Sequence, residues 1–257
     1  MKENSLNSTK AYLFRRKKML LEKTTSLNFN GISDCVEVPD ADNLSITENG
    51  ISISAWIRPD VLNFLTTSDG GGDGEYIEFL GKGNYPGDPD GNQVEYLFRL
   101  YNKTSPTRPN RLSFYVFNKT GGIGVGSYFQ DTLTVGGWIH IIGAIDSTKT
   151  YLYKNGVLRD SDVYTATITP ENTKAPFRIG TVFGATSGDP SYFKGAIKDV
   201  IIFNKKLSDA EALALATQDV VPSGAVARFL CNDYMPGLTD SIGGNDGVIQ
   251  GATYSMQ

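Results

Sequence analysis

Apolar and polar residues alternate along most of the chain from residue 26 onward, which is the period of a half-buried β-strand. In the segment 51–58 the apolar side chains fall on every second position: Ile51, Ile53, Ala55 and Ile57. The same alternation recurs in 95–101 and in 111–117, with one apolar set of Tyr96, Phe98 and Leu100 and another of Leu112, Phe114 and Val116. The pattern therefore predicts short strands, each with one face turned to a core.

Two further segments refine this prediction. Residues 138–145 form a nearly continuous apolar run, which is typical of a central strand covered on both sides. Residues 150–158 read as a hairpin whose Asn155-Gly156 pair suits a type I′ turn, because both central residues of that turn need a positive φ.

One helix is predicted late in the chain. Ser208 and Glu211 have the Ser-x-x-Glu spacing of a capping box, and residues 212–216 continue with good helix formers. Many short strands with turns between them and a single late helix indicate an all-β sandwich of two sheets.

Several separated segments carry a family resemblance. In chain order they are SLNFNGISDCVEVPD at 26–40, ISISAWIRP at 51–59, the short segments 81–84, 138–141, 152–156 and 177–180, then FKGAIKDVIIFN at 193–204 and finally 207–211. Together they resemble the laminin G-like domains of the concanavalin A-like lectin/glucanase family, with Cys35 where a Tyr is common. The resemblance covers roughly residues 26–216 and implies an antiparallel two-sheet jelly roll. We expect this domain to occupy residues 24–257, after a basic N-terminal arm at 1–23.

The end of the chain departs from the family's order. Residues 225–230 and 239–247 resemble a segment that often precedes the opening motif. Because the ends of sandwiches commonly lie close together, residues 218–257 are expected to return as strands that complete the sandwich, as in a circular permutation. The alternative is that this segment packs on another subunit.

Charge and composition exclude several classes of function. The net charge is −4 and the pI is near 5.1, so the chain has no basic field to attract nucleic acid. No apolar run reaches the roughly 18 residues of a membrane span. Cys35, Cys231 and His140 are too few for a four-ligand zinc site. The two cysteines are expected as reduced, buried thiols, with a disulfide between neighbouring strands as the alternative.

Within the first 23 residues, positions 10–18 hold five basic side chains and only a brief apolar stretch follows, so no signal peptide is predicted. They are either a solvated tail or short helix, or an arm that docks onto a neighbouring subunit. The candidate docking residues of this arm are Tyr12, Phe14, Arg15 and Arg16.

No catalytic motif is found. Glycoside hydrolysis needs a pair of carboxylates across one cleft, and no such pair is visible. The single histidine, His140, lies within an apolar strand and is expected to be a buried structural residue. The chain is therefore predicted not to be an enzyme.

Binding features are better represented. Sugars stack on aromatic rings while their hydroxyls form hydrogen bonds, and the candidate ring platform is Tyr76, Tyr85, Tyr101, Tyr115 and Tyr128; the alternative is that these rings belong to the core. Oxygen-rich loops favour Ca²⁺, so Asp88 and Asp90 are candidate ligands; the alternative is that these loops are solvated turns. The family resemblance implies a second candidate calcium site at Asn30, Asp34 and Asp199.

These observations favour a non-catalytic binding or structural module, virion-associated as a phage decoration or fibre-like protein, with glycan recognition and partner subunits in a larger assembly. The alternative is a secreted or cell-surface carbohydrate-binding lectin module. A polysaccharide-active enzyme is the third hypothesis.

Overall fold

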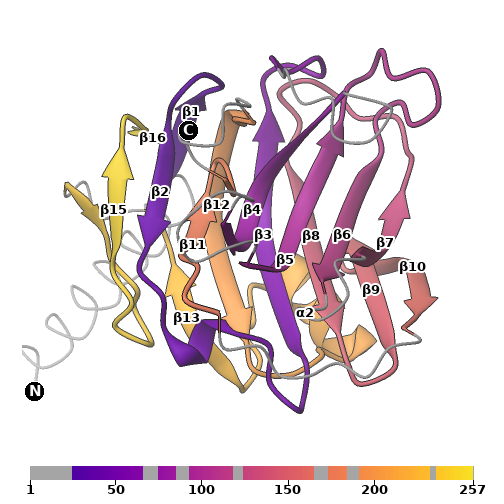
Figure 1. Cartoon of the computed structure of the whole chain (residues 1–257), viewed down its shortest axis with the longest axis vertical. Coiled ribbons are helices and arrows are strands. Elements are labelled where there is room, and N and C mark those ends of the chain that lie inside the picture. Colours follow the sequence, from indigo (N-terminus) through magenta and orange to yellow (C-terminus); the bar gives the residue numbers. More distant parts are fainter. Residues whose placement is uncertain are drawn as a thin grey trace, which may run out of the picture.

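The computed structural model describes residues 25–65, 75–84, 93–117, 124–164, 173–183, 191–231 and 236–256. Two antiparallel β-sheets face each other across an apolar core (Figure 1). One short 3-10 helix, η1 (Asp42–Leu44), and one α-helix, α2 (Asp209–Gln218), accompany the sheets in this part of the chain. The predicted all-β jelly-roll sandwich with one late helix is confirmed.

Sheet A holds eight of the described strands. Seven of them lie side by side in the order β10 (Val157–Val163), β9 (Lys149–Lys154), β8 (Ile139–Ile145), β3 (Ile51–Pro59), β12 (Lys194–Phe203), β1 (Thr25–Asn30) and β16 (Thr253–Met256). The eighth, β13 (Ala225–Phe229), pairs with the second half of β12.

Sheet B also holds eight described strands. Their order is β14 (Gly237–Leu238), β15 (Gly247–Gln250), β2 (Cys35–Val38), β11 (Phe177–Ile179), β4 (Tyr76–Asn84), β5 (Gln93–Tyr101), β6 (Leu112–Phe117) and β7 (Gly124–Phe129).

The core lies between the two sheets and contains the side chains that the alternating pattern predicts. The inward faces of β3, β5 and β6 contribute Ile51, Ile53, Ala55, Ile57, Tyr96, Phe98, Leu100, Leu112, Phe114 and Val116. Every residue of β8 is buried, as expected for a strand covered on both sides. Such burial stabilises the fold by about 1.5–3 kcal/mol for each large apolar side chain.

The hairpin between β9 and β10 turns at Asn155 and Gly156, whose φ angles are 51° and 78°. Both are positive, as a type I′ turn requires. Asn155 also holds the neighbouring strand, because its side-chain oxygen accepts a hydrogen bond from the His140 amide at 2.9 Å.

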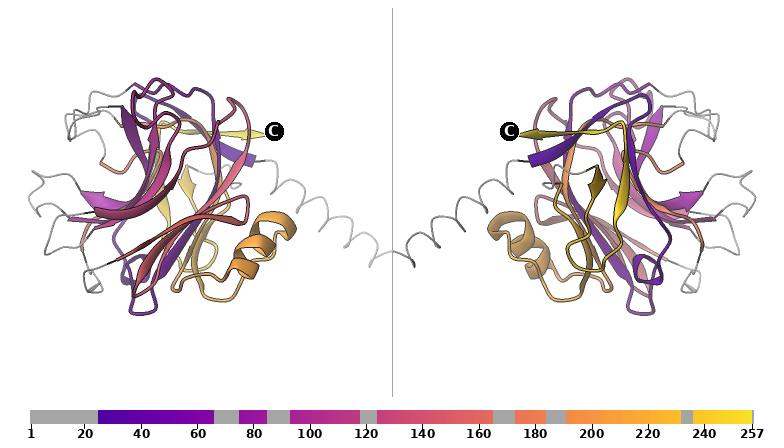
Figure 2. Two further views of the ribbon diagram at one scale, coloured as in Figure 1. Left: turned by 90° about the vertical axis from the view of Figure 1, so that its right-hand side faces the viewer. Right: turned by 90° about the vertical axis from the view of Figure 1, so that its left-hand side faces the viewer.

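Helix α2 begins with the predicted capping box. The Ser208 hydroxyl accepts from the Glu211 amide, and the Glu211 carboxylate accepts from the Ser208 amide. The helix packs on the outer face of sheet A, where Ala212 and Leu215 join a second apolar cluster with Ile142, Tyr153, Ile201, Phe203 and Leu207 (Figure 2). This cluster covers only part of that face.

The strands after residue 218 lie in both sheets. β13 pairs with β12, β15 pairs with β2, and β16 pairs with β1, so that the last described strand lies beside the first (Figure 2). Cys35 and Cys231 are buried as free thiols. No helix in the described residues is long and apolar enough to cross a membrane.

Candidate ligand-binding site

The site begins with a tryptophan on the polar face of a strand. While the isoleucines of β3 point to the core, Ser52, Ser54, Trp56 and Arg58 occupy the alternate, outward positions. Trp56 is opposite His140 on β8 and opposite Lys198 on β12. These three side chains therefore form a row across the outer face of sheet A.

A β-bulge in β12 places a further polar side chain beside this row. The register between β12 and β3 shifts between Lys198 and Ile201, and Asp199 within the shift has a φ of 47°. Non-glycine residues adopt this left-handed conformation infrequently, although Asp and Asn do so more easily than others. Bulges change the direction of side chains, and here the consecutive residues Lys198 and Asp199 both line one pocket.

The end of helix α2 forms another wall of this pocket. The helix terminates at Asp219, which adopts the left-handed conformation with a φ of 56°. Thr217, Gln218 and Asp219 line the pocket beside Leu215. The cap thus places polar groups next to the uncovered part of sheet A.

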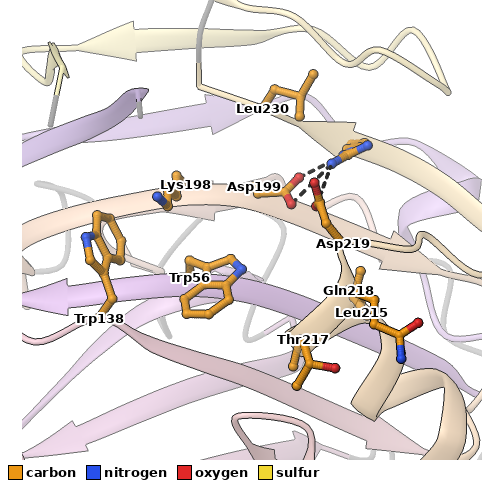
Figure 3. Close-up of a pocket in the computed structure, with 11 residues that line it drawn as sticks. Trp56, Trp138, Lys198, Asp199, Leu215, Thr217, Gln218, Asp219 and Leu230 are labelled. Atoms are coloured by element: carbon orange, nitrogen blue, oxygen red, sulfur yellow. Dashed lines mark hydrogen bonds and ion pairs between the residues drawn. The ribbon is translucent and has the colours of Figure 1, made fainter. Parts of the chain in front are cut away.

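We call this hollow the tryptophan pocket (Figure 3). Its volume is about 540 Å³, and it is lined by Trp56, Trp138, Lys198, Asp199, Leu215, Ala216, Thr217, Gln218, Asp219, Arg228 and Leu230. Both tryptophans of the chain are in this set. They are partly exposed, so their rings are accessible from the pocket.

The aromatic side of the pocket is flanked by cations. The Lys198 ammonium lies 4.4 Å from the centre of the Trp138 ring, and the Arg58 guanidinium lies 5.6 Å from it. Cations over an indole face are attracted by its quadrupole, which holds these side chains in place.

The polar side of the pocket centres on Arg228. Its guanidinium donates to both carboxylate oxygens of Asp199, at 2.7 and 3.2 Å, and lies 4.0 Å from the Asp219 carboxylate (Figure 3). A two-point contact of this kind fixes the orientation of both groups. Donors and acceptors are therefore presented together in a defined geometry.

His140 packs beside Trp56. Its ring centre is 4.9 Å from that of Trp56, and its Nε2 is 2.8 Å from the Ser54 hydroxyl. The side chain is only 1% exposed, and burial lowers its pKa to about 4. His140 is buried, as predicted.

Three of the predicted tyrosines meet on the outer face of sheet B. The Arg99 guanidinium lies 4.6 Å from the Tyr76 ring centre and 4.9 Å from that of Tyr115, and the Tyr76 and Tyr101 rings are 5.0 Å apart. Arg99 also pairs with Glu78 at 3.2 Å. We call these five residues the arginine–tyrosine cluster.

The other two tyrosines are placed differently. Tyr128 is 42% exposed, and the Arg111 guanidinium lies 3.8 Å from its ring centre. Tyr85 lies outside the described residues, as do Asp88 and Asp90 and the arm residues Tyr12, Phe14, Arg15 and Arg16.

The structure does not bring Asn30, Asp34 and Asp199 together. The Asn30 side chain accepts from the amides of Ile32 and Ser33, and Asp34 accepts from the Asn30 amide. Asn30 is opposite Lys194, five residues before Asp199, which corresponds to roughly 16 Å along the strand. Among the described residues no group of three or more His, Cys, Asp or Glu side chains could hold a metal ion. Calcium binding at Asp88 and Asp90 stays a prediction.

Sequence reasoning missed the tryptophan pocket, although one signal was present. A tryptophan at an outward position of an otherwise alternating strand, as at Trp56, is a large ring that the core does not need. Nothing local in the sequence marks the contributions of Asp199, Asp219 and Arg228, because they meet only through the bulge, the helix cap and β13.

A lectin-like sandwich with a pocket on one outer face is the class of protein that these features define. The family model of the concanavalin A-like lectin/glucanases superfamily matches residues 30–212, which is more than half of the chain. The chain belongs to this superfamily, as its motifs indicate. No curated protein sequence is similar enough to the chain to count as a match.

Solved structures share the fold. A protein from Bacteroides ovatus, described as a proposed carbohydrate binding protein, superposes with a TM-score of 0.65 at 15% identity over 91% of this chain; the chain covers 60% of that protein. A heptameric, SAP-like pentraxin from Limulus polyphemus superposes with a TM-score of 0.59 at 11% identity, over 92% of this chain and 96% of the pentraxin. Identities this low establish a common fold and leave the ligand open.

Proposed function

We propose that this chain is a non-catalytic carbohydrate-binding module whose ligand occupies the tryptophan pocket. The observation that carries the proposal is the convergence of both tryptophans with the Arg228–Asp199 pair around one hollow. The proposed carbohydrate binding of the Bacteroides ovatus protein, which has the same fold, supports this direction.

The chemistry of the pocket matches that of a sugar ring. A pyranose has an apolar C–H face that stacks on an aromatic ring and hydroxyls that need hydrogen-bond partners. Trp56 and Trp138 supply the rings, while Arg228, Asp199 and Gln218 supply the polar groups. The volume of about 540 Å³ lies within the range of about 300–1,000 Å³ of small-ligand pockets.

The positions of the carboxylates favour a binding function over a catalytic one. Glycoside hydrolysis needs one carboxyl group that donates a proton and a second that acts as base or nucleophile. In the tryptophan pocket, Asp199 and Asp219 both lie against the Arg228 guanidinium. Burial raises the pKa of Glu78, but this carboxyl is almost fully enclosed on sheet B, where Ser191 and Arg99 donate to it.

The proposal is tested with Trp138→Ala. Because the chain has only two tryptophans and both line the pocket, a bound sugar is expected to change the intrinsic fluorescence of the full chain. Binding found on a glycan array is then measured by fluorescence titration and calorimetry. We expect Trp138→Ala to weaken it at least about tenfold, the equivalent of about 1.4 kcal/mol.

The matched control is Tyr128→Ala, which removes a partly exposed ring from sheet B. Its affinity should equal that of the unaltered chain. Equal losses in both variants, or binding that leaves the tryptophan fluorescence unchanged, would place the ligand elsewhere and contradict the proposal.

The role of the module within a larger particle stays a prediction from the sequence. The residues that would dock the arm lie outside the described residues. A virion-associated module and a secreted or cell-surface lectin would both use a carbohydrate pocket of this kind.

A further inference from the structure

We infer that the tryptophan pocket selects neutral saccharides and discriminates against acidic ones. This inference rests on the proposed function and names the class of its ligand. It follows from how the charges that line the pocket are arranged.

The ionic side chains of the pocket balance. Lys198 and Arg228 contribute two positive charges, and Asp199 and Asp219 contribute two negative charges, so the pocket lining carries no net charge. Arg58 at the Trp138 ring is likewise paired, with Asp60 at 3.2 Å. An uncharged ligand therefore enters without an uncompensated charge on either side.

The arginine of the pocket already has a carboxylate partner. Arg228 holds Asp199 by two hydrogen bonds, at 2.7 and 3.2 Å. Sites that capture a carboxylate generally offer it such a two-point contact with arginine. Here that contact belongs to the protein's own carboxylate, so a uronic or sialic acid would have to compete with Asp199 for the guanidinium.

The surroundings oppose a ligand anion further. Asp199 and Asp219 lie on the same side of the pocket, where they would repel a second carboxylate. The Lys198 ammonium is drawn over the Trp138 ring at 4.4 Å. The net charge of −4 also provides no long-range attraction for an acidic polymer.

Neutral hydroxyls suit the same groups. A sugar hydroxyl both donates and accepts, so adjacent hydroxyls can donate to an Asp199 oxygen and accept from the Arg228 guanidinium. The ion pair keeps both partners oriented before the ligand arrives. Thr217 and Gln218 at the rim add uncharged groups of both kinds.

The test compares neutral and acidic probes on the full chain. The neutral probes are oligosaccharides of glucose, galactose, mannose and xylose; the acidic probes are oligogalacturonate and sialyllactose. Titrations are made by tryptophan fluorescence at low and at high sodium chloride. We expect a neutral probe to bind with less than about a twofold change between the salts, and every acidic probe to bind at least about tenfold more weakly.

The variant Asp199→Asn shifts the charge balance of the pocket. It leaves the pocket with one surplus positive charge, and asparagine tolerates the left-handed conformation of this position. We expect neutral binding to weaken, while oligogalacturonate binding strengthens and becomes sensitive to salt. Asp131→Asn is the matched control, because Asp131 pairs with Lys154 and Arg159 outside the pocket and the net charge changes equally. Asp219→Asn replaces Asp199→Asn if thermal melting shows that the latter is unfolded.

The outcomes distinguish the preference for neutral saccharides from carbohydrate binding itself. Tighter binding of an acidic probe, with a steep loss in salt, overturns the inference and leaves carbohydrate binding intact. The same holds if Asp199→Asn and Asp131→Asn change acidic binding equally. If no probe of either kind binds or alters the fluorescence, the proposed function fails and the inference fails with it.

Discussion

The two outer faces of the sandwich carry similar side chains and use them differently. Sheet B presents the arginine–tyrosine cluster, in which Arg99 contacts two tyrosine rings and a carboxylate. Sheet A presents two tryptophans, cations and carboxylates around the tryptophan pocket. Aromatic, basic and acidic groups are thus present on both faces, and among the described residues those on sheet A line the tryptophan pocket.

The difference lies in how far neighbouring side chains cover these groups. On sheet B, Tyr76, Tyr101 and Glu78 are almost fully buried, and Arg99 fills the space between the rings. On sheet A, helix α2 covers the apolar cluster and stops short of Trp56. The bulge at Asp199 and the cap at Asp219 then hold polar groups at the border of the uncovered area.

This contrast teaches that aromatic content alone does not locate a binding site. Rings that pack on each other and on a paired arginine contribute to stability. Rings that remain accessible beside oriented donors and acceptors can bind a ligand. The predictions below test whether sheet B serves stability and sheet A serves binding.

The largest effect on stability is expected for Arg99→Ala. The change leaves the buried Glu78 carboxylate without its cation, and breaking an enclosed pair in this way costs about 3 kcal/mol. The free energy of unfolding, measured in urea at pH 8, should fall by this amount. Because burial already raises the pKa of Glu78, the loss should be smaller at pH 5, where the carboxyl can take up a proton.

Arg159→Ala is the control for this prediction. Arg159 pairs with Asp131 at a more exposed position, where such pairs contribute about 0–1 kcal/mol. Folded Arg99→Ala should bind saccharide as the unaltered chain does. A loss of affinity without a loss of stability would show that the arginine–tyrosine cluster is itself the ligand site.

A second, smaller effect follows from the single histidine. Because burial holds the pKa of His140 at about 4, below its ordinary 6.5, the unfolded chain takes up the proton first as the pH falls. The stabilisation is complete above pH 6.5 and is lost as the pH decreases toward 4. Between pH 7 and pH 5 the loss amounts to about 2 kcal/mol.

The histidine effect is isolated by comparing the unaltered chain with His140→Gln. Glu78 responds with the opposite sign, because a raised pKa favours the folded state as the pH decreases. Between pH 7 and pH 5 the unaltered chain should therefore lose about 2 kcal/mol of unfolding free energy relative to the variant, whatever Glu78 contributes to both. Identical slopes would mean that His140 is protonated as easily in the folded state as in the unfolded chain.

Much of the fold could be predicted because its signals are local. The alternation at Ile51, Ile53 and Ala55 specifies which face of β3 is buried, and the Asn155-Gly156 pair specifies the turn. The Ser208–Glu211 capping box specifies where the helix begins. Each of these depends on residues within a few positions of one another, so one sequence suffices to recognise them.

The site could be predicted only in part, because its geometry is not local. Arg228 forms its hydrogen bonds with Asp199 across the paired strands β13 and β12. The bulge at Asp199 could not be predicted, because the residue with positive φ is not a glycine. Among the tyrosines, the pattern identifies outward positions on the strands. The pattern does not show how far neighbouring side chains cover these rings. Tyr101, for example, points outward from its strand but is almost fully buried.

The smallest effect on the free energy of unfolding is expected for Tyr101→Phe. This variant also tests whether sheet B contributes to stability without binding the ligand. The Tyr101 hydroxyl accepts a hydrogen bond from Arg108 at 3.1 Å. Phenylalanine keeps the ring contact with Tyr76 and removes only this bond, which stabilises the protein by about 1 kcal/mol. Urea unfolding should show this decrease, while titration of the Tyr101→Phe variant with a bound neutral probe should give the affinity of the unaltered chain. A tyrosine that contacts the ligand would behave in the opposite way, because losing its hydroxyl would lower the affinity by more than it lowers the stability. That result would place the sugar on sheet B, and the tryptophan pocket would then not be its binding site.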